Sequence, residues 1–251
     1  MPLTSLTSLT VADHVATLTI EPPDGLADAA FDAALADAAA EVAADTDGVR
    51  ALIVTGTVPA FCAGWSAEAL AASEPPVAAG IHALAAVPQP VIAAIEGSAH
   101  SAGLEIALAC DIRVAGAGAT FAMPETGNGA VPSGGGTQRL PRVVGRAHAL
   151  RMLLTGDELD AAEAKRIGLL SRVVATGEAA SLAAELAAAI ASRGPIATRM
   201  AKEAVHRGAE MALEQALRYE LDLTVMLQTT ADRAEGVRAF AAKRPPNFTG
   251  H

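Results

Sequence analysis

Hydrophobic and polar positions alternate along the first two thirds of the chain in a pattern that predicts strands and helices in turn. A β-branched run at residues 15–20 predicts a strand, which ends at a cluster of proline and glycine. The alanine-rich segment 26–44 predicts a helix, because its acids recur every three to five residues and form one polar face. These acids are Asp28, Asp32, Asp37 and Glu41. Further strands are predicted at 49–55, 91–95 and 111–115, and further helices at 76–87 and 104–110.

The pattern turns helical from Ala147 onward, and only residues 171–175 resemble a strand there. Pro195 stands at a helix start and opens two long helical segments, 196–208 and 210–228. Strands alternating with helices and then followed by helices alone favour a mainly parallel α/β core. We therefore expect a core over residues 1–190 and a C-terminal helical region over 191–251.

Composition and charge exclude several classes of protein. The chain has 251 residues with a formal net charge of −10, which argues against a general affinity for nucleic acid or an anionic membrane. It leaves room for a local basic pocket that binds a phosphorylated ligand. The longest uncharged stretch, 75–95, contains four prolines and cannot be one membrane-spanning helix. The first 13 residues lack the basic and apolar parts of a signal peptide. We expect a cytoplasmic protein.

Cysteine, histidine and glycine spacings exclude the common cofactor sites. Cys62 and Cys110 are too few for a disulfide framework and are expected to be small buried groups. The histidines are scattered and give no paired ligand spacing, and both the dinucleotide fingerprint and the P-loop are missing. We expect neither a metal nor a nicotinamide cofactor.

Three loops follow predicted strands and offer backbone N–H groups or carboxylates. They span residues 60–66, 96–103 and 123–137. In open α/β sheets, ligands bind at such carboxyl ends of strands. For any one loop alone, turn formation by its glycines is the simpler explanation.

The segment 99–103 is also close to the G-x-S-x-G nucleophile elbow of hydrolases, and it has the required strand–turn–helix context. Two features count against that alternative. Ala99 stands where the motif has its first glycine, and neither His206 nor His251 is well placed as a base carried on a loop.

Taken together, the three loops resemble the enoyl-CoA hydratase/isomerase (crotonase) family. The similarity is colinear from about Val49 to the C-terminus, and its strength lies in the order of the motifs. The motifs are Phe61-Cys62-Ala63-Gly64, Ile106-Ala107-Leu108-Ala109-Cys110-Asp111, Gly134-Gly135-Gly136-Thr137-Gln138-Arg139-Leu140, Leu154-Thr155-Gly156, 161–168, Arg172-Val173-Val174 and Asn247-Phe248.

The resemblance implies a spiral of β-β-α units with a C-terminal helical region used for oligomerisation. It also implies an oxyanion hole, because adding water to an enoyl thioester passes through enolate character at the thioester oxygen. By position the two backbone N–H donors are those of Trp65 and Ala102, and each donor in such a hole is worth about 10²–10³ in rate. The family's substrate and CoA contacts correspond to Ala63, Gly64, Phe240 and Lys243.

Two acids decide the reaction type that the resemblance implies. The hydratases of the family use two glutamates, and both positions are glutamate here, Glu105 and Glu125. Glu105 would orient and deprotonate water, and Glu125 would deliver a proton to the α-carbon. Taken alone, each acid is more simply explained as solvated. However, Glu105 lies in an otherwise apolar run, where a charge needs a purpose or a partner.

The resemblance therefore implies an enoyl-CoA hydratase that converts a trans-2-enoyl-CoA into a 3-hydroxyacyl-CoA. We expect the two acids to titrate as a coupled pair, so that one of them holds its proton more tightly. No cofactor is expected, since coenzyme A is part of the substrate, and the expected assembly is a homotrimer or homohexamer. The alternatives are a Δ3,Δ2-enoyl-CoA isomerase, another enolate-forming acyl-CoA enzyme, or a non-catalytic CoA-binding member.

Overall fold

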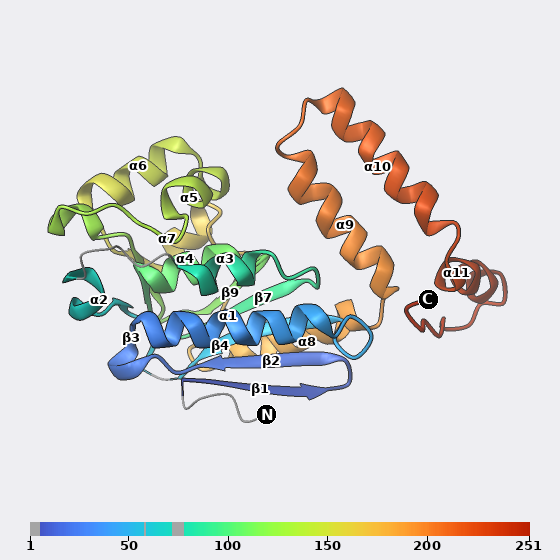
Figure 1. Ribbon diagram of the computed structural model, residues 1–251, viewed down its shortest axis with the longest axis horizontal. Coiled ribbons are helices and arrows are strands. Elements are labelled where there is room, and N and C mark those ends of the chain that lie inside the picture. The colour runs from blue at the N-terminus through green and yellow to red at the C-terminus, as the bar shows by residue number, and fades with distance from the viewer. Residues whose placement is uncertain (1–5, 58, 72–77) are drawn as a thin grey trace.

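A six-stranded sheet forms the centre of the computed structural model, which describes residues 6–57, 59–71 and 78–251 (Figure 1). The strand order is β1-β2-β4-β7-β9-β12. β1 is antiparallel to β2, and all the other neighbours are parallel. The strands are β1 (Thr7–Ala12), β2 (Val15–Ile20), β4 (Ala51–Gly56), β7 (Val91–Ile95), β9 (Ile112–Gly116) and β12 (Arg172–Val174).

Both faces of this sheet are covered, as a mainly parallel sheet requires. Successive side chains of β4 point to the two opposite faces of the sheet. Leu52 and Val54 belong to the core that includes helix α1 (Ala29–Ala44), whereas Ala51 and Ile53 pack with helix α8 (Ala179–Ala191). The two-residue period of a strand thus supplies both cores from one segment.

A second, smaller sheet gives the fold its spiral. β5 (Ala60–Cys62), β8 (Ser98–His100) and β10 (Thr120–Ala122) pair in parallel, and β11 (Leu159–Asp160) joins β10 in antiparallel fashion. Each of the three parallel strands directly follows a strand of the large sheet, and β8 leads into helix α4 (Ala102–Ala109). The expected β-β-α spiral is confirmed.

The predicted helix at 26–44 starts too early in the sequence, and its polar face is wrong at two positions. Its first two residues form β3 (Leu26–Ala27), which pairs with β6 (Gly64–Trp65). The side chain of Asp28 accepts the N–H of Phe31 at 2.7 Å and caps the helix. Asp32 is buried and accepts the N–H of Gly80 at 3.0 Å. A local cap at Asp28 and a long-range hydrogen bond at Asp32 therefore replace the solvated face that the periodicity of the acids predicted.

Other boundaries differ by a few residues. The strands predicted at 15–20 and 91–95 are confirmed, whereas the strand predicted at 49–55 is β4 and the helix predicted at 104–110 begins two residues earlier as α4. Residues 76 and 77 of the helix predicted at 76–87 lie outside the described residues, and α3 spans Ala79–Ala85. β5 and β8 lie inside segments that the sequence predicted as loops, and β10 lies just before the third predicted loop, where no strand was predicted. Runs of three residues carry no readable period.

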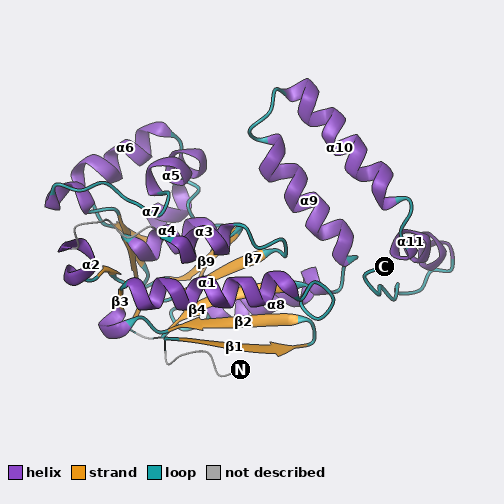
Figure 2. Ribbon diagram, viewed as in Figure 1, coloured by secondary structure: helices purple, strands orange, loops and turns teal. Residues whose placement is uncertain are grey.

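The remaining helices complete the core and form a projecting C-terminal arm. Figures 1 and 2 show α9, α10 and α11 extending away from the sheets, with no strand among them. None of the described helices is long and apolar enough to cross a membrane. These helices are α2 (Ala67–Ala71), α5 (Gly136–Val144), α6 (Arg146–Thr155), α7 (Ala161–Arg166), α9 (Pro195–Gly208), α10 (Leu213–Leu227) and α11 (Ala231–Ala241).

Polar contacts fasten the base of this arm to the sheet. The Lys202 ammonium group lies 2.7 Å from the Asp111 carboxylate and donates to the carbonyl of Gln89 at 2.9 Å. Arg199 donates to the carbonyl of Thr46 at 3.1 Å. α9 is therefore held to the core at several points.

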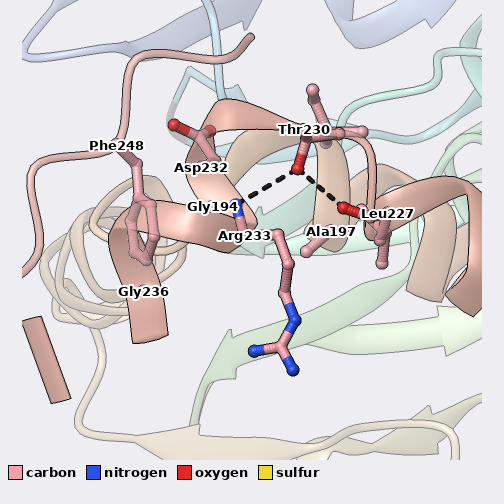
Figure 3. Close-up of a pocket in the computed structure, with 9 residues that line it drawn as sticks. Gly194, Ala197, Leu227, Thr230, Asp232, Arg233, Gly236 and Phe248 are labelled. Atoms are coloured by element: carbon pink, nitrogen blue, oxygen red, sulfur yellow. Dashed lines mark hydrogen bonds between the residues drawn. The ribbon is translucent and has the colours of Figure 1, made fainter. Parts of the chain in front are cut away.

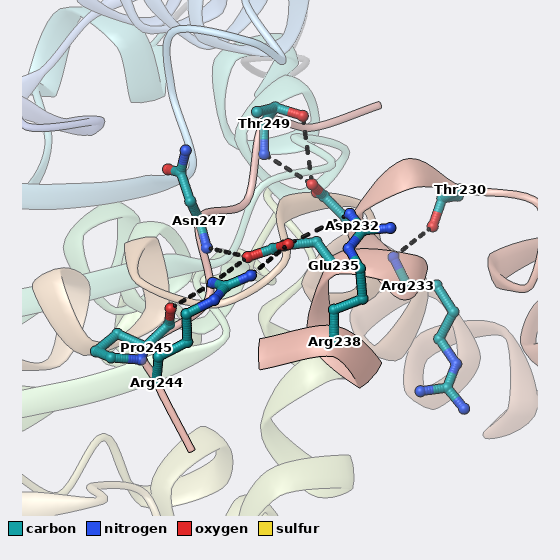
Figure 4. A network of polar contacts seen from close by, with 9 residues as sticks. All are labelled: Thr230, Asp232, Arg233, Glu235, Arg238, Arg244, Pro245, Asn247 and Thr249. Carbon is teal, nitrogen blue, oxygen red and sulfur yellow. Dashed lines mark hydrogen bonds and ion pairs between the residues drawn. The ribbon is translucent and has the colours of Figure 1, made fainter. Parts of the chain in front are cut away.

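A second polar network folds the C-terminal tail back onto α11 (Figure 4). The Glu235 carboxylate accepts from Arg244 at 2.6 and 3.0 Å and from the N–H of Asn247 at 3.1 Å. These donors lower the pKa of Glu235 to about 2, and Arg244 has the largest effect. Asp232 accepts the N–H groups of the tail residues Thr249 and Gly250.

Candidate active site

Glu105 lies in the first turn of α4 and is completely buried. One carboxyl oxygen, Oε1, accepts the N–H of Gly134 at 2.7 Å and that of Gly136 at 2.9 Å. The other oxygen, Oε2, is also buried and has no hydrogen-bond partner within the described part of the chain. The carboxyl group is therefore anchored through one oxygen, and the second remains available for chemistry.

The glycine-rich segment after Glu125 supplies this anchor. A Cβ atom on Gly134 would lie 2.8 Å from Glu105 Oε2, and one on Gly136 would lie 2.8 Å from the methyl end of Met123. The Arg139 guanidinium donates to the Gly134 carbonyl at 2.6 Å and fixes the same turn. The glycines permit close approach to a carboxylate, a function that the sequence analysis did not find.

Burial raises the pKa of Glu105 to about 7. The negative charge of Glu125 raises the pKa of Glu105 further, whereas the N–H groups of Gly136 and Gly134 and the indole of Trp65 oppose the rise. A glutamate with a pKa near neutrality can accept and return a proton at physiological pH. The expectation that the two acids titrate as a coupled pair stays a prediction.

Glu125 opens a short 3-10 helix, Glu125–Asn128, directly after Pro124. Its side chain is buried, and among the described residues neither carboxyl oxygen has a hydrogen-bond partner. Its influence on the Glu105 carboxyl shows that the two acids share one site. The solvated alternative is therefore wrong for both residues.

The two predicted oxyanion donors lie at chain positions where the local helix or strand pairing provides no acceptor for the backbone N–H group. Ala102 is the first residue of α4, so its N–H has no partner within the helix. Beside Trp65, the N–H of Ser66 donates to the carbonyl of Ala27 at 2.8 Å. Because successive N–H groups of a strand point in opposite directions, that of Trp65 points away from β3.

Close contacts hold the segment that carries Trp65 against the segment that carries Ala102. Gly64 has a φ of +140°, and a Cβ atom there would lie 3.3 Å from the Cβ of Ser101. A Cβ atom on Gly103 would lie only 2.0 Å from the carbonyl oxygen of Cys62. Glycine is therefore required at 103, and the packing brings the segment of Trp65 against the start of α4.

Ser101 has the strained backbone of a sharp strand-to-helix turn, with φ 49° and ψ −118°. The structure brings neither candidate base to it. His206 hydrogen-bonds Asp111 at 2.8 Å, and the backbone carbonyl of His251 accepts the N–H of Asp232 on α11. Neither of the two histidines that the hydrolase alternative considered therefore lies at Ser101, and the role of Ala102 as an oxyanion donor stays a prediction.

The predicted substrate contacts divide into two groups. Ala63 and Gly64 directly precede Trp65 and lie at the site. Phe240 and Lys243 lie at the end of α11 in the projecting arm, away from α4 (Figure 1). One chain alone does not bring these two residues to the carboxyls, so their contact with CoA remains a prediction that needs a neighbouring subunit.

Both cysteines are buried and free, as predicted. Burial raises the pKa of the Cys62 thiol to about 11 and that of Cys110 to about 12. Such thiols carry no nucleophilic chemistry near neutral pH.

A cavity of about 180 Å³ lies elsewhere, between the C-terminal helices and the tail. Its lining is mostly apolar and includes Phe248 from the tail and Ala197 from α9 (Figure 3). At its rim the Thr230 hydroxyl accepts the N–H of Arg233 and donates to the carbonyl of Leu227. The cavity contains none of the predicted site residues.

Comparisons with known proteins identify the family of this chain. A profile of the family described as enoyl-CoA hydratase/isomerase matches residues 12–251. The 2,3-dehydroadipyl-CoA hydratase of Escherichia coli is 38% identical over 218 residues, which are 84% of this chain and 85% of that protein. The mitochondrial methylglutaconyl-CoA hydratase of Rattus norvegicus is 42% identical over 215 residues, 80% of this chain and 68% of that protein.

A solved structure extends the similarity to the whole fold. The enoyl-CoA hydratase of Bacillus anthracis superposes with a TM-score of 0.91 at 34% identity, covering 98% of this chain and 100% of that one. The fold is therefore the crotonase fold that the sequence analysis expected. On its sequence and its structure, this chain belongs to the enoyl-CoA hydratase/isomerase family.

Proposed function

We propose that this protein is an enoyl-CoA hydratase that adds water reversibly to a trans-2-enoyl-CoA and gives a 3-hydroxyacyl-CoA. The observation that carries the proposal is the pair of buried acids. Among the described residues, Glu105 Oε2 and both carboxyl oxygens of Glu125 are buried without a partner. Buried polar atoms are normally paired, so three unpaired carboxyl oxygens in one place indicate a site built to receive polar groups.

The backbone donors account for the electrostatic part of the reaction. The thioester oxygen accepts the N–H groups of Trp65 and Ala102, and these donors stabilise the negative charge that develops on it as the enolate forms. The positive end of α4 lies at Ala102 and adds to this stabilisation. Neither donor needs to reorganise, because both belong to the packed backbone.

The two glutamates account for the proton transfers. Glu105, anchored through Oε1, orients the water and removes its proton as the oxygen attacks C3. Glu125 delivers to the α-carbon a proton that the pair of acids takes from the same water, so that both carboxylates end the step as they began it. A double-bond shift within the acyl chain can be carried by one acid, whereas addition of water uses both, and this favours hydration over isomerisation.

Hydration is tested by mixing the purified protein with trans-2-enoyl-CoAs of increasing chain length and following the absorbance of the conjugated thioester. We expect the absorbance to fall, with kcat/KM rising with pH through about 7 as Glu105 ionises. A gain of absorbance with 3-enoyl-CoAs and none of this loss would identify an isomerase. No change with either substrate would overturn the proposal of an enzyme acting on enoyl-CoA.

We further propose a homotrimer or homohexamer in which the C-terminal arm reaches a neighbouring subunit. One face of α10 carries four apolar side chains at intervals of four residues, all more than half exposed. They are Leu213, Leu217, Leu221 and Val225. An exposed stripe of this kind is typical of a helix that packs on a partner. The tail network holds α11 so that Phe240, 88% exposed, points outward with Lys243 beside it.

The double variant Leu217→Glu/Leu221→Glu is expected to dissociate the oligomer, because two charges would be buried in the contact. We expect a smaller mass in sedimentation equilibrium and a several-fold rise in KM, since Phe240 and Lys243 would no longer reach CoA. Gln215→Glu is the matched control, because it adds a charge on the opposite side of the same helix. An unchanged mass in the double variant would contradict this role of α10.

A further inference from the structure

Trp65 is the only tryptophan of the chain, and its side chain is 6% exposed. Its indole nitrogen Nε1 is buried, and nothing in the described part of the chain accepts its hydrogen bond. An indole N–H can only donate, and leaving a buried donor unpaired is unfavourable. The ring therefore places a donor without an acceptor at the proposed active site.

Carboxyl oxygens that lack a hydrogen-bond donor lie near the indole of Trp65. Glu105 Oε2 is buried and unpaired among the described residues, and the charge of Glu125 raises the pKa of the Glu105 carboxyl. Trp65 directly follows Gly64, which packs against Ser101 at the start of α4, and Glu105 lies in the first turn of that helix. The indole also lowers the pKa of the Glu105 carboxyl. The unpaired indole N–H of Trp65 and the unpaired Oε2 of Glu105 therefore belong to one cluster of buried polar groups.

An ionised carboxylate has about four lone-pair positions for hydrogen bonds. Two donors, Gly134 and Gly136, already use Oε1 of Glu105. The indole N–H of Trp65 would use one position on Oε2. One position is then left, and it suits a single water molecule that donates one proton to the base.

We propose that the indole N–H of Trp65 is a positioning donor for Glu105: it binds Oε2 of the ionised carboxylate and directs the remaining lone pair to the reacting water. This role rests on the hydratase function proposed above. Trp65 then serves the site twice. Its backbone N–H faces the thioester oxygen, and its side chain orders the base.

The other charged groups around Glu105 are few among the described residues. Glu125 faces it from the 3-10 helix, and Arg139 faces it from α5. The guanidinium of Arg139 is itself held by the Gly134 carbonyl, and its Nη2 lies 3.5 Å from Nδ1 of His82 on α3. Glu125 and Arg139 are therefore the groups whose charge a titration of Glu105 must take into account.

The first test uses the intrinsic fluorescence of the single tryptophan and needs no substrate. If the indole contacts the Glu105 carboxyl, its emission should change in one step near pH 7 as that carboxyl ionises. The step should vanish in Glu105→Gln, whose side chain does not titrate. An emission profile that is the same in the wild type and in this variant would overturn the contact, whatever reaction the enzyme performs.

The second test removes the donor and keeps the ring. Because there is one tryptophan, incorporating the sulfur analogue β-(3-benzothienyl)alanine in place of tryptophan changes only position 65. Loss of a hydrogen bond to an ionised group disfavours the base form, so we expect kcat to fall about tenfold at pH 6 and to recover at pH 9, with KM little changed.

Trp65→Phe is the second variant for the same profile. Because phenylalanine also lacks the donor, the acid limb of the kcat–pH profile of Trp65→Phe should move in the same direction. An acid limb that stays in place in both proteins would show that the ring only packs. If the wild type hydrates no enoyl-CoA, the hydratase proposal fails, and the fluorescence titration still decides the contact.

Discussion

Glu105→Gln is expected to lower kcat for hydration at least a hundredfold. Glutamine keeps an oxygen that can accept the N–H groups of Gly134 and Gly136, so the turn around the side chain is retained. It cannot remove a proton from water, and loss of a general base typically costs 10²–10⁴ in rate. The measurement is steady-state kinetics with the preferred enoyl-CoA. Turnover close to that of the wild type would show that Glu105 is not the base.

The same variant gives a stability readout that is independent of activity. The pKa of Glu105 is raised from 4.5 to about 7 in the folded protein, so between these pH values the native state binds more protons than the unfolded state. The free energy of unfolding should therefore decrease as pH rises across this range and level off above it. Relative to Glu105→Gln, the wild type should lose on the order of 3 kcal/mol between pH 4 and pH 8. Parallel curves for the two proteins would mean that Glu105 is not held in this environment.

An alanine substitution at position 105 would affect folding as well as catalysis. It would leave the N–H groups of Gly134 and Gly136 buried and unpaired, which is strongly unfavourable. A loss of activity in Glu105→Ala would therefore mix chemistry with misfolding. For this reason the glutamine variant is the informative one.

Local patterns predicted most strands of the large sheet, although not β1, and the two acids of the site were assigned through the family resemblance. The strand at residues 91–95 is a short apolar run that ends where a polar loop begins, and such a run can be recognised without any tertiary contact. Glu105 is visible because it is the one acid in an apolar helix. A buried charge leaves a signal in the sequence when its neighbours in the chain are all apolar.

The rest depends on contacts between distant segments. Gly134 and Gly136 are about thirty residues from Glu105, and no local rule says that their N–H groups bind its carboxylate. The indole of Trp65 reaches the same carboxyl from a different strand. Asp32 also shows the limit, because a buried hydrogen bond from the distant Gly80 replaces the solvated position that periodicity predicted. Such partners are fixed by the spiral, which only the assembled fold reveals.

Glu125→Gln is expected to lower kcat at least a hundredfold as well, but for a different structural reason. The acid that protonates the α-carbon would be lost. Among the described residues no group donates to either carboxyl oxygen of Glu125, so no hydrogen bond of the fold depends on its charge. We therefore expect the melting temperature to stay close to that of the wild type, and KM to change little. Glu158→Gln, an exposed glutamate beside His100, is the matched control.

The two glutamine variants together separate hydration from the alternatives. If both acids hold the water, each variant should lose hydration to a similar extent, and the double variant should lose little more, because residues that act as one unit are not additive. An enzyme that uses one acid alone would tolerate the other substitution. Turnover near the wild-type value in Glu125→Gln, with Glu105→Gln inactive, would therefore assign the chemistry to Glu105 alone and favour an isomerase-like reaction over hydration.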